Sequence, residues 1–312
     1  MLLIILIVSA FVLIAGALIL SYWIFKLGFL HTPNPNQDQY RIPDNEQYAV
    51  HKERMHSLIA ELDAIPYEPV TITSHDGLKL FGRYYHFEDG APVHIEFHGY
   101  KSLALRDFCG GNSIVRSLRH NTILVDQRAH GMSEGNAITY GIKERHDCLT
   151  WIEYVISRFG NDTKIFISGV SMGAATVLMA TSLPLPQNVV GVIADCPYSS
   201  PKEIILKVGK DLNLPSNIMV PFLHIAARIF GHFSLTETDS IESVKVSKVP
   251  ILLIHGEDDN FVPYEMSLRI AKACSSELTF MSVPGAGHAL SYMVNAKMYE
   301  EAMVRFIENC LK

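Results

Sequence analysis

Two serines lie in the pattern Gly-x-Ser-x-Gly, which many hydrolytic enzymes use to hold a nucleophile on a sharp turn between a strand and a helix. Ser171 lies in "GVSMG" at 169–173, and Ser133 lies in "GMSEG" at 131–135. The apolar run "KIFIS" leads into Ser171 and "MGAATVLMA" leads out of it, whereas the residues around Ser133 form a glycine-rich loop. The sequence therefore predicts that Ser171 is the nucleophile and that Ser133 is a loop residue.

A serine hydroxyl needs a base, and the base needs an acid that orients it. When the serine lies on such a turn, the order along the chain is serine, acid, histidine. Three acidic residues at 257–259 follow the apolar run "ILLIHG", and His288 follows the last such run, in "PGAGHALSY". We expect both loops to meet above the sheet beside Ser171. The other histidines that we considered do not have this placement: His120, His224 and His232.

The reaction also needs two backbone N–H groups that stabilise the negative oxygen of the intermediate. One should be the amide of Met172, directly after the nucleophile. The other should follow the early run "VHIEFHG", where the amide of Tyr100 comes after Gly99. A turn that only ends this strand is the structural alternative at Tyr100.

The elements that must position these residues alternate along the chain. Strands are predicted at 70–74, 78–86, 93–99, 121–127, 164–170, 189–195, 249–256 and 277–285, with a hairpin turn at 75–77. Helices are predicted at 48–65, 104–118, 141–159, 172–183, 264–275 and 292–311. Alternating strands and helices indicate an α/β fold with a mostly parallel central sheet and helices on both of its faces.

A long insertion interrupts the alternation after the strand that ends at 195. Residues 198–246 contain several helical pieces, of which "PSNIMVPFLHIAARIF" is the most apolar. Because the insertion follows the carboxyl end of a strand, we expect a helical cap over the site. Its apolar residues suggest a hydrophobic substrate group, although they are equally expected from packing of the cap on the core: Ile205, Leu206, Met219, Phe222 and Leu223.

The N-terminus differs in kind from the rest of the chain. Residues 1–25 carry no charge before Lys26, and as a helix they would span about 37 Å, enough to cross a membrane. No basic residue precedes the run, so an uncleaved anchor at 1–26 is favoured over a signal peptide. Lys26 and Arg41 favour a cytoplasmic location for the remainder. A polar linker is expected at 27–47, followed by the catalytic domain at 48–312.

The composition excludes some classes of function. The 312 residues are 48% hydrophobic and 19% charged, and the formal net charge of −6 gives no reason to expect a nucleic-acid partner. Five scattered cysteines form no C-x-x-C pair, which argues against a zinc site or a disulfide framework. No metal or cofactor is expected.

Several motifs together resemble the α/β-hydrolase superfamily, in particular bacterial membrane-associated serine hydrolases related to esterases, acylglycerol lipases and serine aminopeptidases. They are "HGY", "DQRAHGMSEG", "GVSMG", "HGEDDNFVP" and "GAGHA". The resemblance covers about 68–311 and implies Ser171, Asp259 and His288 as the catalytic triad, with Asp259 preferred to Asp258. It also implies that Arg128 and His130 have structural roles.

The resemblance implies a serine hydrolase that cleaves carboxylic esters of small molecules through an acyl-enzyme. The apolar cap residues suggest that the substrate carries a hydrophobic acyl or aryl group. Thioester or peptide amide cleavage by the same triad is the first alternative. A binding protein without catalytic activity on the same scaffold is the second, and an intact triad disfavours it.

Overall fold

The computed structural model describes the backbone of residues 1–312 and all side chains except those of residues 216–218. The strands are β1 (Glu68–Thr73), β2 (Lys79–Tyr85), β3 (Val93–Phe97), β4 (Asn121–Val125), β5 (Ile165–Val170), β6 (Val189–Asp195), β7 (Ile251–Gly256) and β8 (Leu278–Val283). The helices up to the middle of the chain are α1 (Leu2–Gly28), α2 (Glu46–Ala49), α3 (Lys52–Asp63), α4 (Ala104–Phe108), α5 (Gly111–Ser117), α6 (Glu144–Phe159) and α7 (Met172–Ala180). Those that follow are α8 (Pro201–Asp211), α9 (Ser216–Ile225), the π-helix η1 (Ala226–Phe230), α10 (Ser240–Val244), α11 (Tyr264–Ala273), α12 (Ser291–Val294) and α13 (Ala296–Cys310).

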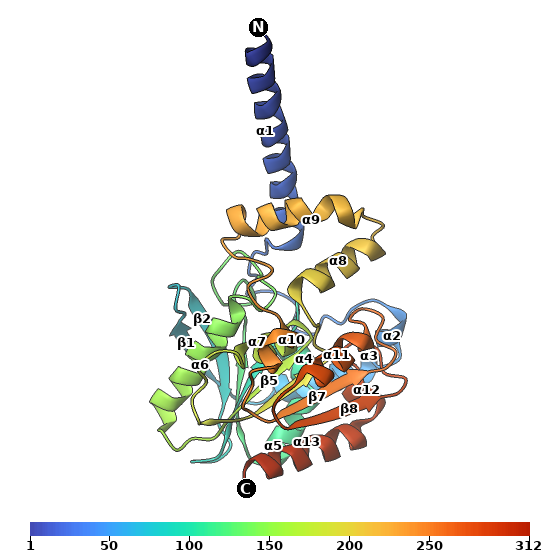
Figure 1. Ribbon diagram of the computed structural model, residues 1–312. Coiled ribbons are helices and arrows are strands. Elements are labelled where there is room, and N and C mark those ends of the chain that lie inside the picture. Colours follow the sequence, from blue (N-terminus) through green and yellow to red (C-terminus); the bar gives the residue numbers. More distant parts are fainter.

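The eight strands form one sheet in the order β1-β2-β4-β3-β5-β6-β7-β8 (Figure 1). β1 and β2 pair antiparallel with each other, β2 pairs antiparallel with β4, and all later neighbours are parallel. The chain leaves β3 toward β4 on one side and then crosses to β5 on the other. In such sheets, sites form where the strand order reverses, at the carboxyl ends of the strands. Here that position lies between β3 and β5.

Helices cover both faces of the sheet. Buried residues of α6, α7, α10 and α11 pack on one face, where the core includes Trp151 and Ile152. On the other face α5 and α13 form one cluster and α3, α4 and α12 form a second. Strands buried on both sides explain their nearly continuous apolar sequences. The predicted mostly parallel α/β sheet with helices on both faces is confirmed.

Three of the predicted helices are each two shorter helices, and the one at 292–311 divides into α12 and α13 at Asn295. The predicted helix at 104–118 breaks between α4 and α5, where a Cβ on Gly110 would lie 2.2 Å from the Tyr292 ring. The predicted helix at 48–65 is preceded by α2, which Asn45 caps by accepting a hydrogen bond from the Tyr48 amide. The strands lie within two residues of their predicted positions, because buried apolar runs define them well.

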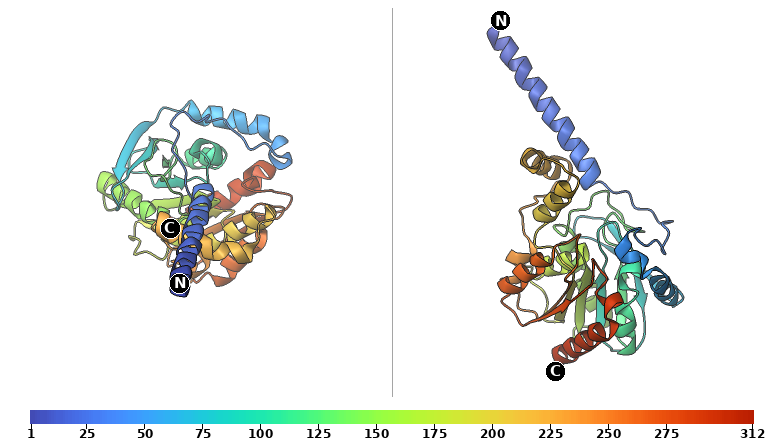
Figure 2. Two further views of the ribbon diagram at one scale, coloured as in Figure 1. Left: turned by 90° about the horizontal axis from the view of Figure 1, so that it is seen from above. Right: turned by 90° about the vertical axis from the view of Figure 1, so that its right-hand side faces the viewer.

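The long apolar helix α1 projects from the domain, and α8 and α9 lie on the side of the domain from which it emerges (Figure 2). α1 is long and apolar enough to cross a membrane. Its last turns pack on the domain, since Phe25 and Phe29 are buried with the cap residue Leu223. Of the linker expected at 27–47, the first two residues belong to α1, and Ile42 in the remainder is buried on the domain.

A buried carboxyl group on β3 makes the stability of the fold depend on pH. Glu96 is fully buried and accepts a hydrogen bond of 3.2 Å from Asn112 Nδ2. Burial raises the pKa of Glu96 to about 8. The folded protein therefore keeps this proton up to about pH 8, whereas the unfolded chain releases it near its ordinary pKa of 4.5. The stability that this group contributes is lost as the pH rises between the two values.

We expect Glu96→Gln to remove this dependence. The variant should match the wild type at pH 5 and exceed its stability at pH 8, on the order of 3 kcal/mol. Thermal unfolding of both proteins in detergent across this pH range measures the difference. Glu153→Gln on the exposed face of α6 is the matched control and should follow the wild type. Parallel stability curves for Glu96→Gln and wild type would contradict the assignment.

Candidate active site

Ser171 lies on a tight turn between β5 and α7. Its φ of 56° and ψ of −113° place it in a backbone region that L-residues rarely adopt. Glycine is required on both sides of it: a Cβ on Gly169 would lie 2.2 Å from the Gly173 backbone, and one on Gly173 would lie 1.8 Å from the Phe97 carbonyl oxygen. The Ser171 amide donates 2.8 Å to the Asp195 carbonyl at the end of β6, which fixes the turn.

The structure brings Ser171, His288 and Asp259 together from three loops at the carboxyl edge of the sheet. His288 Nε2 lies 2.9 Å from Ser171 Oγ, and His288 Nδ1 lies 2.7 Å from Asp259 Oδ2. A carboxylate only accepts, so Nδ1 carries the proton and Nε2 is free to accept the serine proton. This is the geometry that general-base activation of a hydroxyl requires.

Asp259 is buried, and several donors hold it in place. Its Oδ1 accepts the amides of Phe261 and Val262 at 2.9 and 2.8 Å, and its Oδ2 lies 3.2 Å from His255 Nε2. Burial alone would raise the pKa of Asp259, but His288 and the hydrogen bond from His255 hold it well below its usual range. The carboxyl group is therefore ionised wherever His288 is able to act as a base. Asp258, by contrast, is exposed.

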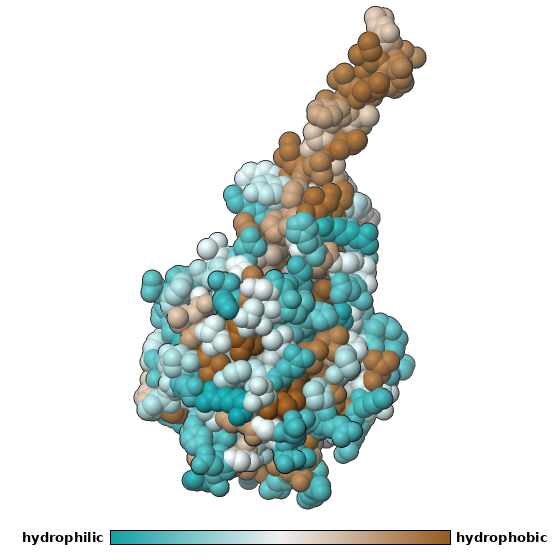
Figure 3. Space-filling model, turned by 90° about the vertical axis from the view of Figure 1, so that its left-hand side faces the viewer, coloured by the Kyte–Doolittle hydropathy of each residue, from teal (hydrophilic) through white to brown (hydrophobic). Residues whose placement is uncertain are grey.

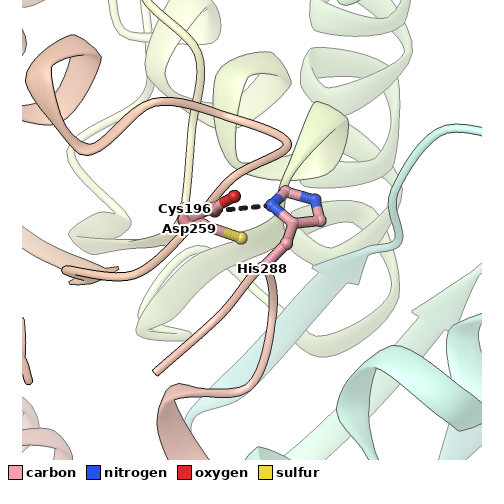
Figure 4. Close-up of side chains that lie close together, drawn as sticks. All are labelled: Cys196, Asp259 and His288. Atoms are coloured by element: carbon pink, nitrogen blue, oxygen red, sulfur yellow. Dashed lines mark hydrogen bonds and ion pairs between the residues drawn. The ribbon is translucent and has the colours of Figure 1, made fainter. Parts of the chain in front are cut away.

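Cys196 lies beside this pair, and Figure 4 shows the His288 ring facing Asp259 with the thiol next to them. Burial raises the pKa of the Cys196 thiol well above its ordinary value, so it is neutral. The three ligand-type atoms lie within 4.8 Å of one another, but His288 and Asp259 are already bonded to each other. A second cluster, His75 with Asp76 and Asp147, already has a cation between its carboxylates, because Arg128 binds both.

The loop after β3 holds the second expected amide close to the serine. A Cβ on Gly99 would lie 3.4 Å from Ser171 Cβ, so the two turns are in contact. The neighbouring amides are occupied: Gly99 N donates 2.7 Å to Asp107 Oδ2, and Lys101 N donates 3.0 Å to His130 Nε2. The amides of Tyr100 and Met172 have no acceptor in the described part of the chain. They are thus free for a negative oxygen beside Ser171.

The side chain of Tyr100 connects this loop to the end of α1. Its hydroxyl donates 3.1 Å to the Gly28 carbonyl, and the hydroxyl of Tyr140 donates 2.9 Å to the same oxygen. The two rings stack with centroids 5.2 Å apart. The last carbonyls of a helix lack partners within the helix. Here the two phenols satisfy one of them and fix the position of the Tyr100 loop.

We expect Tyr100→Phe to lower kcat roughly tenfold, about 1.4 kcal/mol, with little change in KM, because a displaced amide weakens binding of the transition state only. Steady-state kinetics on a soluble ester would measure both constants, and thermal unfolding would report stability. Tyr154→Phe is the control, since that hydroxyl accepts from Arg158 away from the site. A rise in KM at constant kcat would contradict this role for Tyr100.

Comparisons with known proteins agree with this fold. The model of the prolyl oligopeptidase family matches residues 227–312, which contain Asp259 and His288 but not Ser171. The esterase Pf2001 of Pyrococcus furiosus superimposes with a TM-score of 0.65 at 20% identity, covering 90% of this chain and 98% of the esterase. The chain has the α/β-hydrolase fold.

A bacterial relative and a further solved structure are also similar to this chain. The uncharacterized protein YqkD of Bacillus subtilis is 25% identical over 190 residues, 61% of this chain and 62% of YqkD, so the match spans about three fifths of that relative. The acylaminoacyl peptidase of Pyrococcus horikoshii has a TM-score of 0.55 at 17% identity, covering 80% of this chain and 42% of the peptidase. The comparisons support a hydrolase and do not separate an esterase from a peptidase.

Ser133, the serine of the other Gly-x-Ser-x-Gly match, is buried, and its hydrogen bonds do not involve the triad. Its Oγ accepts the Phe81 amide at 2.8 Å and also donates to the carbonyl of Asp126. Arg128 in the same loop is buried and forms hydrogen bonds of 2.6 Å with both carboxylate oxygens of Asp147. His130 in turn holds the Tyr100 loop through Lys101. This loop supports the site rather than reacting.

A cavity of about 280 Å³ opens at Ser171. Its walls combine apolar groups, among them Phe261 and Val170, with polar ones, among them Arg106. None of the five apolar cap residues expected to meet the substrate lines it. Leu223 and Ile205 pack instead on the cluster around the end of α1, which agrees with the packing alternative.

The segment before α3 takes the place that the cap was expected to have. Pro43, Asn45, Gln47 and Tyr48 line the cavity. Tyr48 Oη donates 2.9 Å to the His288 carbonyl, and Gln47 Nε2 donates 3.0 Å to the Asp258 carbonyl. The polar composition concealed this role in the sequence. Two apolar residues of this segment, Ile42 and Tyr48, could have indicated the contact in the sequence, since both are buried against the domain.

Proposed function

We propose that this protein is a serine hydrolase that cleaves carboxylic esters through an acyl-enzyme. The observation that carries the proposal is the continuous chain of contacts from Asp259 through His288 to Ser171, next to two unoccupied amides. A substrate carbonyl placed beside Ser171 would meet the nucleophile and both amides together. Few structural roles require this combination on a strained turn.

In the first half of the reaction Ser171 Oγ attacks the acyl carbonyl while His288 Nε2 takes its proton. The amides of Tyr100 and Met172 stabilise the resulting negative oxygen, and Asp259 stabilises the imidazolium. His288 then returns the proton to the leaving alcohol as the ester bond breaks. In the second half, water activated by His288 attacks the acyl-enzyme and releases the acid.

The cavity favours an ester with a hydrophobic acyl or aryl group of modest size. Its volume of about 280 Å³ lies at the lower end for ligand pockets. The Phe261 ring, 5.0 Å from the His288 ring, offers an apolar surface next to the reacting atoms. Est1E of Butyrivibrio proteoclasticus, an α/β neighbour with a TM-score of 0.58 at 19% identity, binds ferulic acid, an aryl acid.

A peptidase or thioesterase using the same triad is the second candidate, favoured by the match to the prolyl oligopeptidase model. A peptidase that binds the amino group of its substrate would need a carboxylate in the cavity that is free to accept a hydrogen bond from this group. Asp107 lines the cavity, but its two oxygens already accept from Gly99 N, Ser102 Oγ and Arg106 Nε. This occupied carboxylate favours an ester over an amide.

A matched substrate panel tests the proposal. Purified full-length protein is assayed on p-nitrophenyl esters from acetyl to palmitoyl, together with a p-nitroanilide and a thioester of the same acyl group. The proposal predicts the highest kcat/KM for a short or medium ester. A higher kcat/KM for the anilide or the thioester than for the esters would favour the second candidate, a peptidase or thioesterase. Absence of turnover on every member would favour a binding protein.

We also propose that α1 is an uncleaved single-pass anchor and that the domain faces the cytoplasm. Burial of Phe25 and Phe29 in the domain supports retention of the last turns of the helix, because cleavage after either residue would remove part of a packed core. Lys26, at the domain end of α1, supports the orientation. Labelling of the half-exposed Cys274 by an impermeant maleimide only after cell lysis is the expected result.

A further inference from the structure

The exposure of residues along α1 indicates the depth in the membrane at which the cap contacts this helix. None of residues 1–20 is buried, and Ser21 is the first residue of the helix that is completely covered. The 19 residues from Leu2 to Leu20, none of which is buried, span about 28 Å at 1.5 Å per residue, close to the ~30 Å thickness of a hydrocarbon core. Whatever covers Ser21 therefore lies at the edge of that core.

The covering elements are α9 and η1, which cross the base of α1 (Figure 1). Phe230 of η1 lies with its ring centroid 5.3 Å from Tyr22 and 6.1 Å from Phe25. Ala226 and Ala227 are fully buried at the crossing. Tyr22 and Trp23 are residues typical of a membrane–water interface. The cap helix thus crosses α1 where the interface must be.

This edge of the cap also exposes apolar side chains to the outside. Leu212 and Leu214, in the loop between α8 and α9, and Ile229 in η1 are exposed, Ile229 by 50%. The cation Arg228 next to Ile229 is exposed as well. Figure 3 shows the apolar surface of α1 continuing to the point where it meets the domain. Apolar and cationic groups side by side suit the headgroup region of a bilayer.

We propose that the edge of the cap formed by the α8–α9 loop, α9 and η1 is a lipid-binding surface that lies in the headgroup region of the membrane crossed by α1. The occupant is the lipid surface itself. This inference rests on the proposed anchoring of α1, and it is independent of which acyl bond the hydrolase cleaves. The cap would then be a second membrane contact, in addition to the helix.

Site-specific photocrosslinking tests the proposal on the full-length protein in phosphatidylcholine–phosphatidylglycerol vesicles that carry an alkyne-tagged lipid. Benzoylphenylalanine replaces Ile229 or Leu214 in the cap edge. The matched control is Leu311, an exposed apolar residue after α13 at the opposite end of the domain (Figure 1). A fourth variant carries the crosslinker at Leu6 in α1. We expect lipid adducts at Leu6, Ile229 and Leu214, several-fold above those at Leu311.

The outcomes separate the two hypotheses. Adducts at Leu6 with Ile229 and Leu214 no higher than Leu311 would overturn the lipid-binding surface and leave the anchor intact. Absence of an adduct at Leu6 would contradict the proposal that α1 is a membrane anchor. It would thereby also contradict the lipid-binding surface, which depends on that anchor. Ester turnover by each variant shows that the variant is folded. This turnover does not depend on the outcome of the crosslinking.

Discussion

Ser171→Ala is expected to abolish covalent labelling by a fluorophosphonate probe and to lower ester turnover by roughly 10⁴- to 10⁶-fold. The substitution removes the hydroxyl that lies 2.9 Å from His288 Nε2 and adds no atom to the crowded turn. His288 then has no nucleophile to deprotonate, while the two free amides and the cavity persist. Residual rate above the uncatalysed reaction would come from these remaining groups.

Ser133→Ala is the matched control, because it changes the other serine of the same pattern. It deletes an acceptor of the Phe81 amide, so it should lower thermal stability by about 1 kcal/mol or more. Labelling by the probe should persist in the folded fraction. Equal labelling of wild type and Ser171→Ala would show that the nucleophile lies elsewhere.

Asp259→Asn is the second large effect that we expect, a fall in kcat of roughly 10³- to 10⁴-fold with the fold intact. An asparagine amide can donate to His288 Nδ1, which favours the tautomer with its proton on Nε2. That nitrogen can no longer accept the proton of Ser171. The asparagine Oδ1 can still accept the amides of Phe261 and Val262, so the loop should keep its shape.

Asp258→Asn separates the role of the acid from a general charge effect in this loop. Asp258 is exposed, and the hydrogen bonds of its backbone to Ala286 and Gln47 do not involve the carboxylate. The kcat of Asp258→Asn should therefore stay within a few-fold of the wild-type value. The opposite ranking of the two variants in steady-state assays would place the acid one residue earlier in the chain.

The parts of the site that could be predicted are those fixed by the ends of buried strands. Ser171, Asp259 and His288 each follow a strand whose apolar run is unmistakable, so the sheet dictates their meeting point. Local sequence also identifies the turn, because only glycine fits at 169 and 173. The triad assignment itself remains a prediction until the variants are measured.

The parts that could not be predicted depend on packing between distant segments. Residues 27–47 resemble a free linker, yet Gln47 and the following residue Tyr48 bind the loops of Asp258 and His288. The apolar cap residues fitted a substrate pocket and a packed interface equally well. Their partner turned out to be the end of α1, a contact that no local pattern encodes.

The junction between α1 and the domain limits where the chain can change in length. Phe29 and His31 pair through their backbones with Ile138 and Asn136, directly after the carbonyl that Tyr100 binds. One residue inserted before Gly28 would turn the domain about 100° around the helix axis and shift it by about 1.5 Å. Insertions and deletions should therefore be tolerated at the free end of α1 and rejected at its base. The domain therefore has a single rotational orientation relative to α1.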